Sequence, residues 1–295
     1  MNVWPSKTCL ITGGNSGIGK AAAIQLAKHG LKIIIGCRDE KRGLVALEEI
    51  KEKSNSDSVE LLLLDMSSQC CIRSAVNELI SNHSQIDVLI HNAADFDISR
   101  KAPQYSDENI ETVWATNHIG PVLLTELLLD KLKQSEQGRI ITIASQGLVL
   151  HPFLKINYSN PEFTNEKFRV ETAYYQSKLA QVMYTYWLSD KLKNTKITVN
   201  CIRVTNVKID IERYPNLSQL MKLMYSVKSK FSISPDEMAQ TYLYLATSPE
   251  LQSVTGKYFD EKNRLVTSST FSKDKHQIEK LMELTAKYIF TDSKS

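Results

Sequence analysis

Short apolar runs alternate along the chain with longer amphipathic stretches. Runs rich in β-branched residues predict strands at 8–12, 32–36, 59–65, 86–91, 139–145, 196–203 and 257–259. Apolar residues at helical spacing predict helices at 17–29, 39–53, 68–83, 107–134 and 170–193. Alternation of this kind predicts an α/β, doubly wound parallel sheet of about seven strands with helices on both faces.

Two stretches interrupt the alternation, at 146–168 and 204–234, and each follows the carboxyl end of a predicted strand. Ligands of open α/β sheets bind at that edge, so we expect both segments to shape a substrate pocket. Because no Pro-, Gly- or Ser-rich linker divides residues 1–295, we expect a single domain.

Two further amphipathic segments leave their roles open. Residues 217–227 carry Leu and Met at helical spacing, which indicates either core packing or a flexible lid over the pocket. Residues 277–290 predict a final helix that packs on the body, faces a partner subunit or touches a membrane surface.

Composition narrows the class of protein. The 42% hydrophobic and 23% charged residues are typical of a globular protein and exclude disorder as its main state. A net charge of +3 is too small to predict nucleic-acid binding.

The chain shows no secretion signal and no apolar run of the ~18 residues that predict an integral membrane segment. The cysteines are odd in number and lack a CxxC pair, which favours a reducing, cytoplasmic location; they are Cys9, Cys37, Cys70, Cys71 and Cys201. The spacing of the six histidines does not indicate a metal site.

The sequence TGGNSGIG at 12–19 joins the first predicted strand to the first predicted helix. Residues without a Cβ let backbone amides approach a pyrophosphate at the positive end of a helix. A purely structural turn is the alternative, but the strand–loop–helix context favours a dinucleotide site. The candidate contacts are Gly13, Asn15, Ser16, Gly17, Ile18 and Gly19.

This glycine spacing resembles the TGxxxGxG loop of the short-chain dehydrogenase/reductase family. The resemblance covers residues 7–203, about two-thirds of the chain. It implies a Rossmann-type fold and a nicotinamide dinucleotide cofactor. The segments GGNSGIGK, CRDEKRG and AYYQSKLA resemble those of the NADP-dependent, retinol dehydrogenase-like branch, whose substrates are lipophilic alcohols and carbonyls.

The end of the second predicted strand bears on the choice between NADP and NAD. Cys37 stands where NAD-preferring relatives carry an acidic residue, and Arg38 follows it. A guanidinium pairs with the 2′-phosphate of NADP, so NADP (NADPH) is favoured and NAD is the alternative. Arg38 could instead be an ordinary solvated charge.

Two further motifs extend the resemblance along the cofactor. In the family an Asp in the place of Asp65 meets the adenine, and Met66 would contribute its backbone. Asp65 or Ser67 could also cap the next helix. HNAA at 91–94 resembles the family's NNAG, which implies that Asn92 braces the central strands and the cofactor and that Ala93 lines the cofactor site.

Four residues match the family's catalytic set in order: Asn117 in NHIG, Ser145 at the end of the fifth strand, and Tyr174 with Lys178 in YYQSK. Residues four apart on a helix share one face, so Tyr174 and Lys178 would lie side by side. Each alone could be an ordinary core or surface residue. Their joint occurrence implies catalysis, with Tyr174 and Lys178 also binding the cofactor.

The chemistry of carbonyl reduction explains these residue types. Hydride addition creates an alkoxide that must receive a proton, which a phenol can supply. A free Tyr has a pKa near 10, so lowering it by about 3 units takes about 4 kcal/mol, which a neighbouring ammonium could provide. Ser145 would hold the substrate oxygen. The resemblance to the family implies that Asn117 holds a water that links Lys178 to solvent.

One departure keeps other functions open. Val204 and Thr205 replace the family's Pro-Gly pair after the sixth strand, so we expect a different or a strained turn there. The main expectation is an oxidoreductase that interconverts a small-molecule alcohol and a carbonyl. The alternatives are a non-catalytic NADP-binding regulator and an epimerase or dehydratase. Homo-oligomers are common in the family.

Overall fold

The computed structural model describes residues 7–164, 167–208, 229–230 and 232–290. In this part of the chain, seven parallel strands form one sheet in the order β3-β2-β1-β4-β5-β6-β7. The strand order reverses between β1 and β4, which is where dinucleotides bind in such sheets. The predicted α/β fold is therefore confirmed. The strands are β1 (Thr8–Thr12), β2 (Lys32–Cys37), β3 (Val59–Leu63), β4 (Val88–His91), β5 (Gly138–Ser145), β6 (Ile197–Val204) and β7 (Lys257–Phe259).

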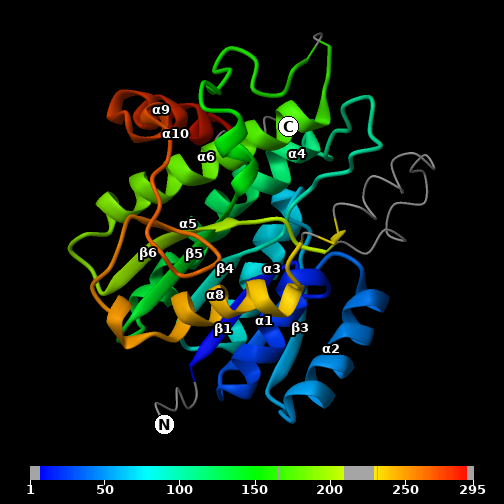
Figure 1. Cartoon of the computed structure of the whole chain (residues 1–295). Helices are drawn as coiled ribbons and strands as arrows, with labels where there is room; N and C mark the ends of the chain where they lie inside the picture. The colour runs from blue at the N-terminus through cyan, green and yellow to red at the C-terminus, as the bar shows by residue number, and fades with distance from the viewer. Residues whose placement is uncertain (1–6, 165–166, 209–228, 231, 291–295) are drawn as a thin grey trace.

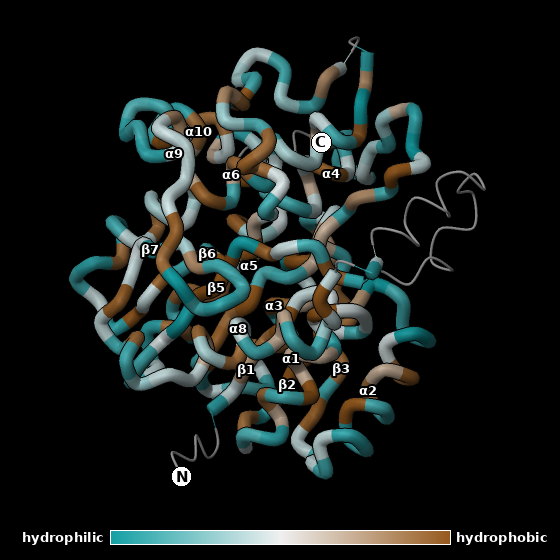
Figure 2. The backbone as a smooth tube through the Cα atoms, in the orientation of Figure 1, coloured by the Kyte–Doolittle hydropathy of each residue, from teal (hydrophilic) through white to brown (hydrophobic). Residues whose placement is uncertain are grey.

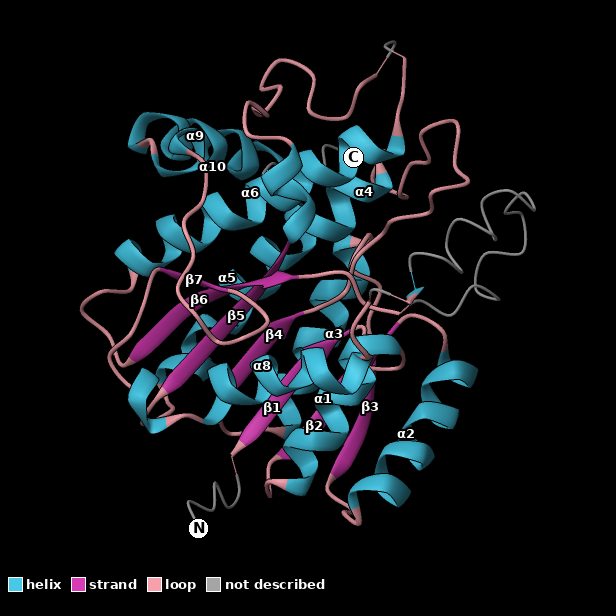
Figure 3. Cartoon of the chain, in the orientation of Figure 1, coloured by secondary structure: helices cyan, strands magenta, loops and turns pink. Residues whose placement is uncertain are grey.

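Helices cover both faces of the sheet (Figures 1 and 3). One face carries α1 (Gly17–Lys28), α2 (Glu40–Ser54) and α8 (Pro235–Thr247). The other carries α3 (Gln69–Asn82), α5 (Gly120–Lys133) and α6 (Val170–Lys191), and α10 (Lys275–Ile289) packs against α6. The shorter elements are α4 (Thr112–Trp114), the π-turn η1 (Ala115–Ile119), the 3-10 segments η2 (Gln146–Leu150) and η4 (Pro249–Leu251), and α9 (Thr270–Lys273).

The side chains of the sheet pack into two large hydrophobic cores, one on each face. Successive side chains point to opposite faces, so Leu10 and Ile34 pack with α3, α5 and α6, whereas Ile11 and Ile35 pack with α1, α2 and α8. The central strands are mainly hydrophobic and the outer turns mainly hydrophilic (Figure 2). Burial on both faces explains why the strands appear in the sequence as continuous apolar runs.

The single helix predicted at 107–134 is wrong in two respects: helical structure begins only at Thr112, and a π-turn divides it. Asn109 has φ 57°, and Tyr105 pairs with Glu111 in an antiparallel bridge, so the chain turns before it becomes helical. The Glu111 carboxylate then accepts a hydrogen bond from Trp114 N (3.0 Å), which caps α4. The π-turn separates α4 from α5.

Other boundaries also differ. The predicted strand at 59–65 ends at residue 63, and the strand predicted from 86 begins at residue 88. The sequence analysis missed α8, although Ser234 and Glu237 form the capping box that starts it. The amphipathic segment at 217–227 lies outside the described residues.

The C-terminal helix α10 packs on the body of the molecule, which was one of its three predicted roles. Ile278, Leu281 and Ile289 join the core formed with α6. None of the described helices is both long enough and apolar enough to cross a membrane.

A buried hydrogen bond ties α10 to the π-turn. Thr285 Oγ1 donates to Leu281 O (2.8 Å), so its contact with His118 Nε2 (2.8 Å) is one in which the imidazole donates. Burial lowers the pKa of His118 to about 3, so this imidazole is neutral. The π-turn is thereby anchored one residue beyond Asn117.

We expect Thr285→Val to lower the free energy of unfolding by about 1–3 kcal/mol, because it leaves a buried imidazole N–H without an acceptor. Thr247→Val is the matched control, since Thr247 Oγ1 bonds to Leu243 O in its own helix (2.7 Å) without a histidine partner. Urea unfolding monitored by circular dichroism measures both. Equal destabilisation of the two variants would contradict the proposed anchor.

Candidate active site

The glycine-rich loop between β1 and α1 leaves no space for side chains at its turning points. Gly13 has φ 65° and Gly17 has φ 54°, a region that L-residues rarely adopt. A Cβ on Gly19 would overlap the side-chain nitrogen of Asn92, and one on Gly14 would lie 2.6 Å from a methyl of Ile35. The loop therefore presents bare backbone at the N-terminus of α1, which suits an anionic phosphate.

Asn92 braces the ends of β1 and β4, as the sequence predicts. Its Nδ2 donates to Thr12 O (3.0 Å) and Gly13 O (3.1 Å), and its Oδ1 accepts from Tyr242 OH (3.1 Å). The side chain thus satisfies carbonyl groups where the ladder between the strands stops.

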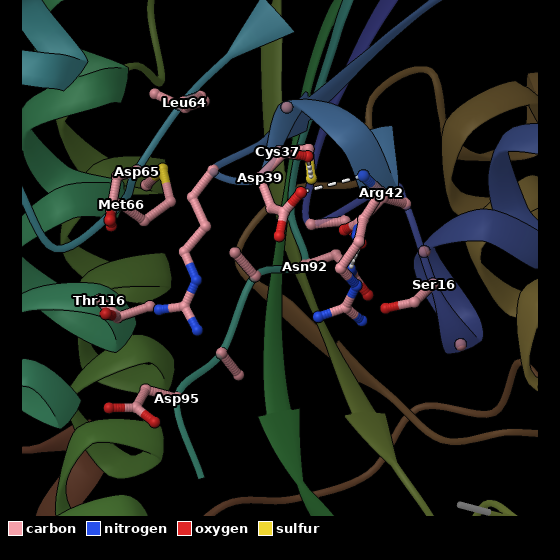
Figure 4. A pocket seen from close by; sticks show the side chains of 18 of the residues that line it. Ser16, Cys37, Asp39, Arg42, Leu64, Asp65, Met66, Asn92, Asp95 and Thr116 are labelled. Carbon is pink, nitrogen blue, oxygen red and sulfur yellow. Dashed lines mark hydrogen bonds between the residues drawn. The ribbon is translucent and has the colours of Figure 1, made fainter. Parts of the chain in front are cut away.

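A cavity of about 420 Å³ opens beside this loop. In Figure 4, Arg42 and Ser16 lie on one side of it, and Leu64, Asp65 and Met66 on the opposite side. All predicted cofactor residues except Lys178 line it: Gly13, Asn15, Ser16, Gly17, Ile18, Gly19, Arg38, Asp65, Met66, Asn92, Ala93 and Tyr174.

Two arginines line this cavity where the sequence analysis proposed one. Arg38 follows β2 and is exposed, and Arg42 lies in the first turn of α2. Asp39 also lines the cavity, but its carboxylate caps α2 by accepting from Arg42 N (3.0 Å). The four-residue spacing of the arginines at a helix start was a signal that the sequence analysis did not use.

Asp65 does not cap the following helix. Its Oδ1 accepts from Ser67 N (2.8 Å) and Ser67 Oγ (2.7 Å), which closes a local turn. Ser68 caps α3 instead, by accepting from Cys71 N (3.2 Å). The alternative in which Asp65 or Ser67 caps the next helix is therefore wrong, because these two residues bond to each other and Ser68 takes the cap position.

Lys178 lies beneath the cavity, within the protein. Its Nζ donates to Ile143 O (3.0 Å) and lies 5.6 Å from the centre of the Tyr174 ring. Burial lowers the pKa of Lys178 to about 8. A nearby negative charge would favour its ammonium form, so the charge of this lysine responds to what binds beside it.

Asn117 also lies in the wall of the site, in the π-turn. Its Nδ2 donates to Asp95 O (3.1 Å) and to Ser177 Oγ (3.0 Å), and its Oδ1 accepts from Asp95 N (2.7 Å). Ser177 Oγ donates in turn to Tyr174 O (2.7 Å). Irregular π-turns occur frequently at functional sites, and here the turn connects Asn117 to the backbone of Tyr174.

A second cavity of about 590 Å³ shares Ile18, Phe96 and Tyr174 with the first. Ser145 lines it, and its Oγ accepts from Gly147 N (3.1 Å). The two segments predicted to shape a substrate pocket contribute to its walls through residues 146–147, 149–150, 204–208, Ser229 and Ser232. Tyr174 therefore stands where the two cavities meet.

The turn after β6 differs from the family pattern without left-handed strain. Thr205 has no positive φ, unlike Asn55, Asn109, Phe163 and Asn263. Its Oγ1 donates to Gln146 Oε1, which joins the two segments beside the second cavity.

Comparison with known proteins places this geometry in a family. The sequence profile described as short chain dehydrogenase matches residues 7–161. The chain belongs to the short-chain dehydrogenase/reductase family. It is 34% identical over 259 residues to mouse (Mus musculus) retinol dehydrogenase 13, covering 87% of this chain and 76% of that protein. It is 34% identical over 270 residues to human (Homo sapiens) retinol dehydrogenase 14, covering 86% and 78%.

Solved structures agree on the fold of this short-chain dehydrogenase. A protein from Mycobacterium paratuberculosis matches with a TM-score of 0.73 and 23% identity, covering 97% of this chain and 95% of that chain. A short-chain dehydrogenase from Shigella flexneri 2a str. 301 complexed with NADP matches with a TM-score of 0.66 and 20% identity, covering 88% and 99%. Together with the family match, these findings support an oxidoreductase that interconverts alcohols and carbonyls with NAD(P).

We expect Gly19→Ala to weaken dinucleotide binding at least about tenfold, because the added methyl displaces the Asn92 amide and the loop that it holds. Gly43→Ala is the matched control, since a Cβ there meets the methyl groups of Leu61, the flexible end of a side chain. Quenching of intrinsic fluorescence by NADPH measures both affinities. Wild-type affinity in Gly19→Ala would contradict the placement of the dinucleotide.

Proposed function

We propose that this protein is an NADP-dependent oxidoreductase that interconverts a lipophilic alcohol and its carbonyl. The observation that carries the proposal is the position of Tyr174, which lines both the cavity beside the glycine loop and the cavity that contains Ser145. A phenol at that junction can exchange a proton with a substrate in one cavity while a dinucleotide occupies the other.

The residues of the first cavity fit a dinucleotide with a 2′-phosphate. The bare backbone of Gly13 and Gly19 gives the pyrophosphate close access, and Asp65 with Met66 offers a place for the adenine. Arg38 and Arg42 supply two guanidinium groups for the 2′-phosphate. When bound, the nicotinamide supplies or accepts the hydride.

The proton is handled by residues of the chain. In the direction of reduction, the Tyr174 phenol donates its proton to the substrate oxygen. Ser145 Oγ–H, which has no acceptor within the described residues, donates a hydrogen bond to that same oxygen. The Lys178 ammonium stabilises the phenolate that remains. It would also hold the nicotinamide ribose.

Asn117 serves this relay in two ways. Its two amide hydrogens are used by Asp95 O and Ser177 Oγ, so it fixes the loop and the helix turn around Tyr174. One lone pair of Oδ1 remains beyond the bond from Asp95 N and can hold the water that returns a proton to Lys178.

The second cavity favours an apolar substrate. Hydrophobic residues from three segments line it, including Phe96, Val149, Leu150, Val204 and Val207. Its polar lining includes Ser145 and Tyr174, which would hold a single oxygen. The related retinol dehydrogenases carry a lipophilic alcohol in their names, which supports the same substrate class.

We expect Tyr174→Phe to lower kcat for carbonyl reduction by about 10²–10⁴-fold, because it removes the proton donor. NADPH binding should remain. Tyr175→Phe is the matched control, since Tyr175 lines only the second cavity, and its effect should stay within about fivefold. NADPH consumption with a panel of aldehydes and ketones measures both.

Turnover that survives in Tyr174→Phe but disappears in Tyr175→Phe would contradict the assignment of the proton donor. NADPH binding without turnover of any carbonyl by the wild-type protein would instead support a non-catalytic regulator.

We expect Arg38→Ala and Arg42→Ala each to weaken NADPH binding by about 10–100-fold, the effect of losing one hydrogen-bonded charge pair. NADH affinity should change less than about threefold, because NADH lacks the 2′-phosphate. Lys41→Ala is the control, since this neighbouring residue is exposed and does not line the cavity. Titration of each variant with both cofactors checks this, and parallel losses for NADPH and NADH would contradict the NADP assignment.

A further inference from the structure

Two of the three hydrogen bonds of the Asn117 side chain are made with the main chain of one residue, Asp95, and the third goes to Ser177 Oγ. Asn117 accepts from Asp95 N (2.7 Å) and donates to Asp95 O (3.1 Å), so the amide is latched on both sides to the same peptide segment. The orientation of Asn117 therefore depends on where the backbone of Asp95 lies.

The neighbouring residue places a second group of the site. The ring of Phe96 stacks on the ring of Tyr174, with centroids 4.2 Å apart and planes inclined by 29°. The dipeptide Asp95–Phe96 thus touches two of the four proposed catalytic side chains, Asn117 through its backbone and Tyr174 through an aromatic ring.

Regular structure does not fix this dipeptide. Between β4 and α4 the described chain contains no helix or strand, only the isolated bridge from Tyr105 to Glu111 and local turns. The position of Asp95 therefore depends on side-chain contacts, which include those with Asn117 and with Thr112 in α4.

Arg100 supplies further contacts of this kind. Its Nη1 and Nη2 donate to the two carboxylate oxygens of Asp95, at 2.7 and 2.9 Å. Thr112 Oγ1 closes the group by donating to Asp95 Oδ2 (2.9 Å) while accepting from Arg100 Nη1 (2.9 Å). We call these two hydrogen bonds between Arg100 and Asp95 the fork. The two side chains are only 10% and 18% exposed, so solvent screens the fork weakly.

A second carboxyl, that of Glu111, also lies near Arg100, but at 3.9 Å. Burial raises the pKa of Glu111 to about 7, so near neutral pH this carboxyl is only partly charged. Asp95 is therefore the main counter-ion of Arg100. The fork joins the dipeptide to Thr112 in the first turn of α4, close to the π-turn that carries Asn117.

We propose that Arg100 is a positioning residue: through its two-pronged pair with Asp95, it sets the orientation of the Asn117 amide and the packing of Phe96 on Tyr174. This inference rests on the proposed function for its effect on turnover. Its structural part, the latch on Asn117, stands on the contacts that Asp95 makes with Arg100 and with Asn117, whatever the reaction.

Hydrogen exchange of the Asn117 side-chain amide tests the latch without any assay of activity. We expect Arg100→Lys, which keeps the charge but loses the fork, to speed this exchange at least about tenfold in NMR spectra of the full chain. Arg264→Lys is the control, because Arg264 also pairs with an aspartate, through Nε and Nη2 on Asp260 Oδ2 (2.9 and 2.7 Å), on the segment after β7. Unchanged exchange in Arg100→Lys, or equal acceleration in both variants, overturns the inference.

Kinetics test the consequence. Arg100→Lys should lower kcat at least about tenfold while KM for NADPH stays within about threefold, because the glycine loop is untouched. Asp95→Asn should act alike, and the double variant should be no worse than either single one, since both changes break the same pair. A lower melting temperature with unchanged kcat and unchanged exchange indicates a merely structural pair and overturns the inference. Absence of turnover in the wild-type protein counts against the proposed function, while the exchange experiment still decides the latch.

Discussion

The site depends on how this chain satisfies backbone groups where β1 and β4 stop. The carbonyls of Thr12 and Gly13 lie beyond the ladder between these strands, and buried groups of this kind must find partners. Asn92 provides both bonds from one amide. Because a Cβ on Gly19 would collide with that amide, the brace and the glycine loop determine each other.

A second asparagine side chain, that of Asn117, also bonds to backbone groups beside the site. Asn117 satisfies the backbone of Asp95 in a segment without regular structure, and its second donor holds Ser177 below Tyr174. Lys178 of α6 is buried with its Nζ on Ile143 O of β5, and so lacks the solvation that would keep it fully charged. The amides of Asn92 and Asn117 therefore hold the backbone around the cavity in place. The desolvated amine of Lys178 supplies a charge that depends on what binds beside it.

Much of this could be predicted from the sequence because it depends on local patterns. Continuous apolar runs identified the strands, and the glycine spacing located the loop whose positive φ angles the structure shows. Predictions failed where a turn replaces the helix that the apolar pattern predicts, or where a different polar residue caps it. The bridge from Tyr105 to Glu111 delays the helix after β4, and the turn that Asp65 forms with Ser67 leaves Ser68 to cap α3. The Arg100–Asp95 fork has no sequence signature, because its role appears only when Asp95 is seen against Asn117.

A crystal structure of the protein with NADPH tests the central claim most directly. We expect the 2′-phosphate between Arg38 and Arg42, the nicotinamide beside Tyr174 where the two cavities meet, and Asn92 still bonded to Thr12 and Gly13. A complex in which the nicotinamide lies away from both Tyr174 and Ser145 would contradict this account.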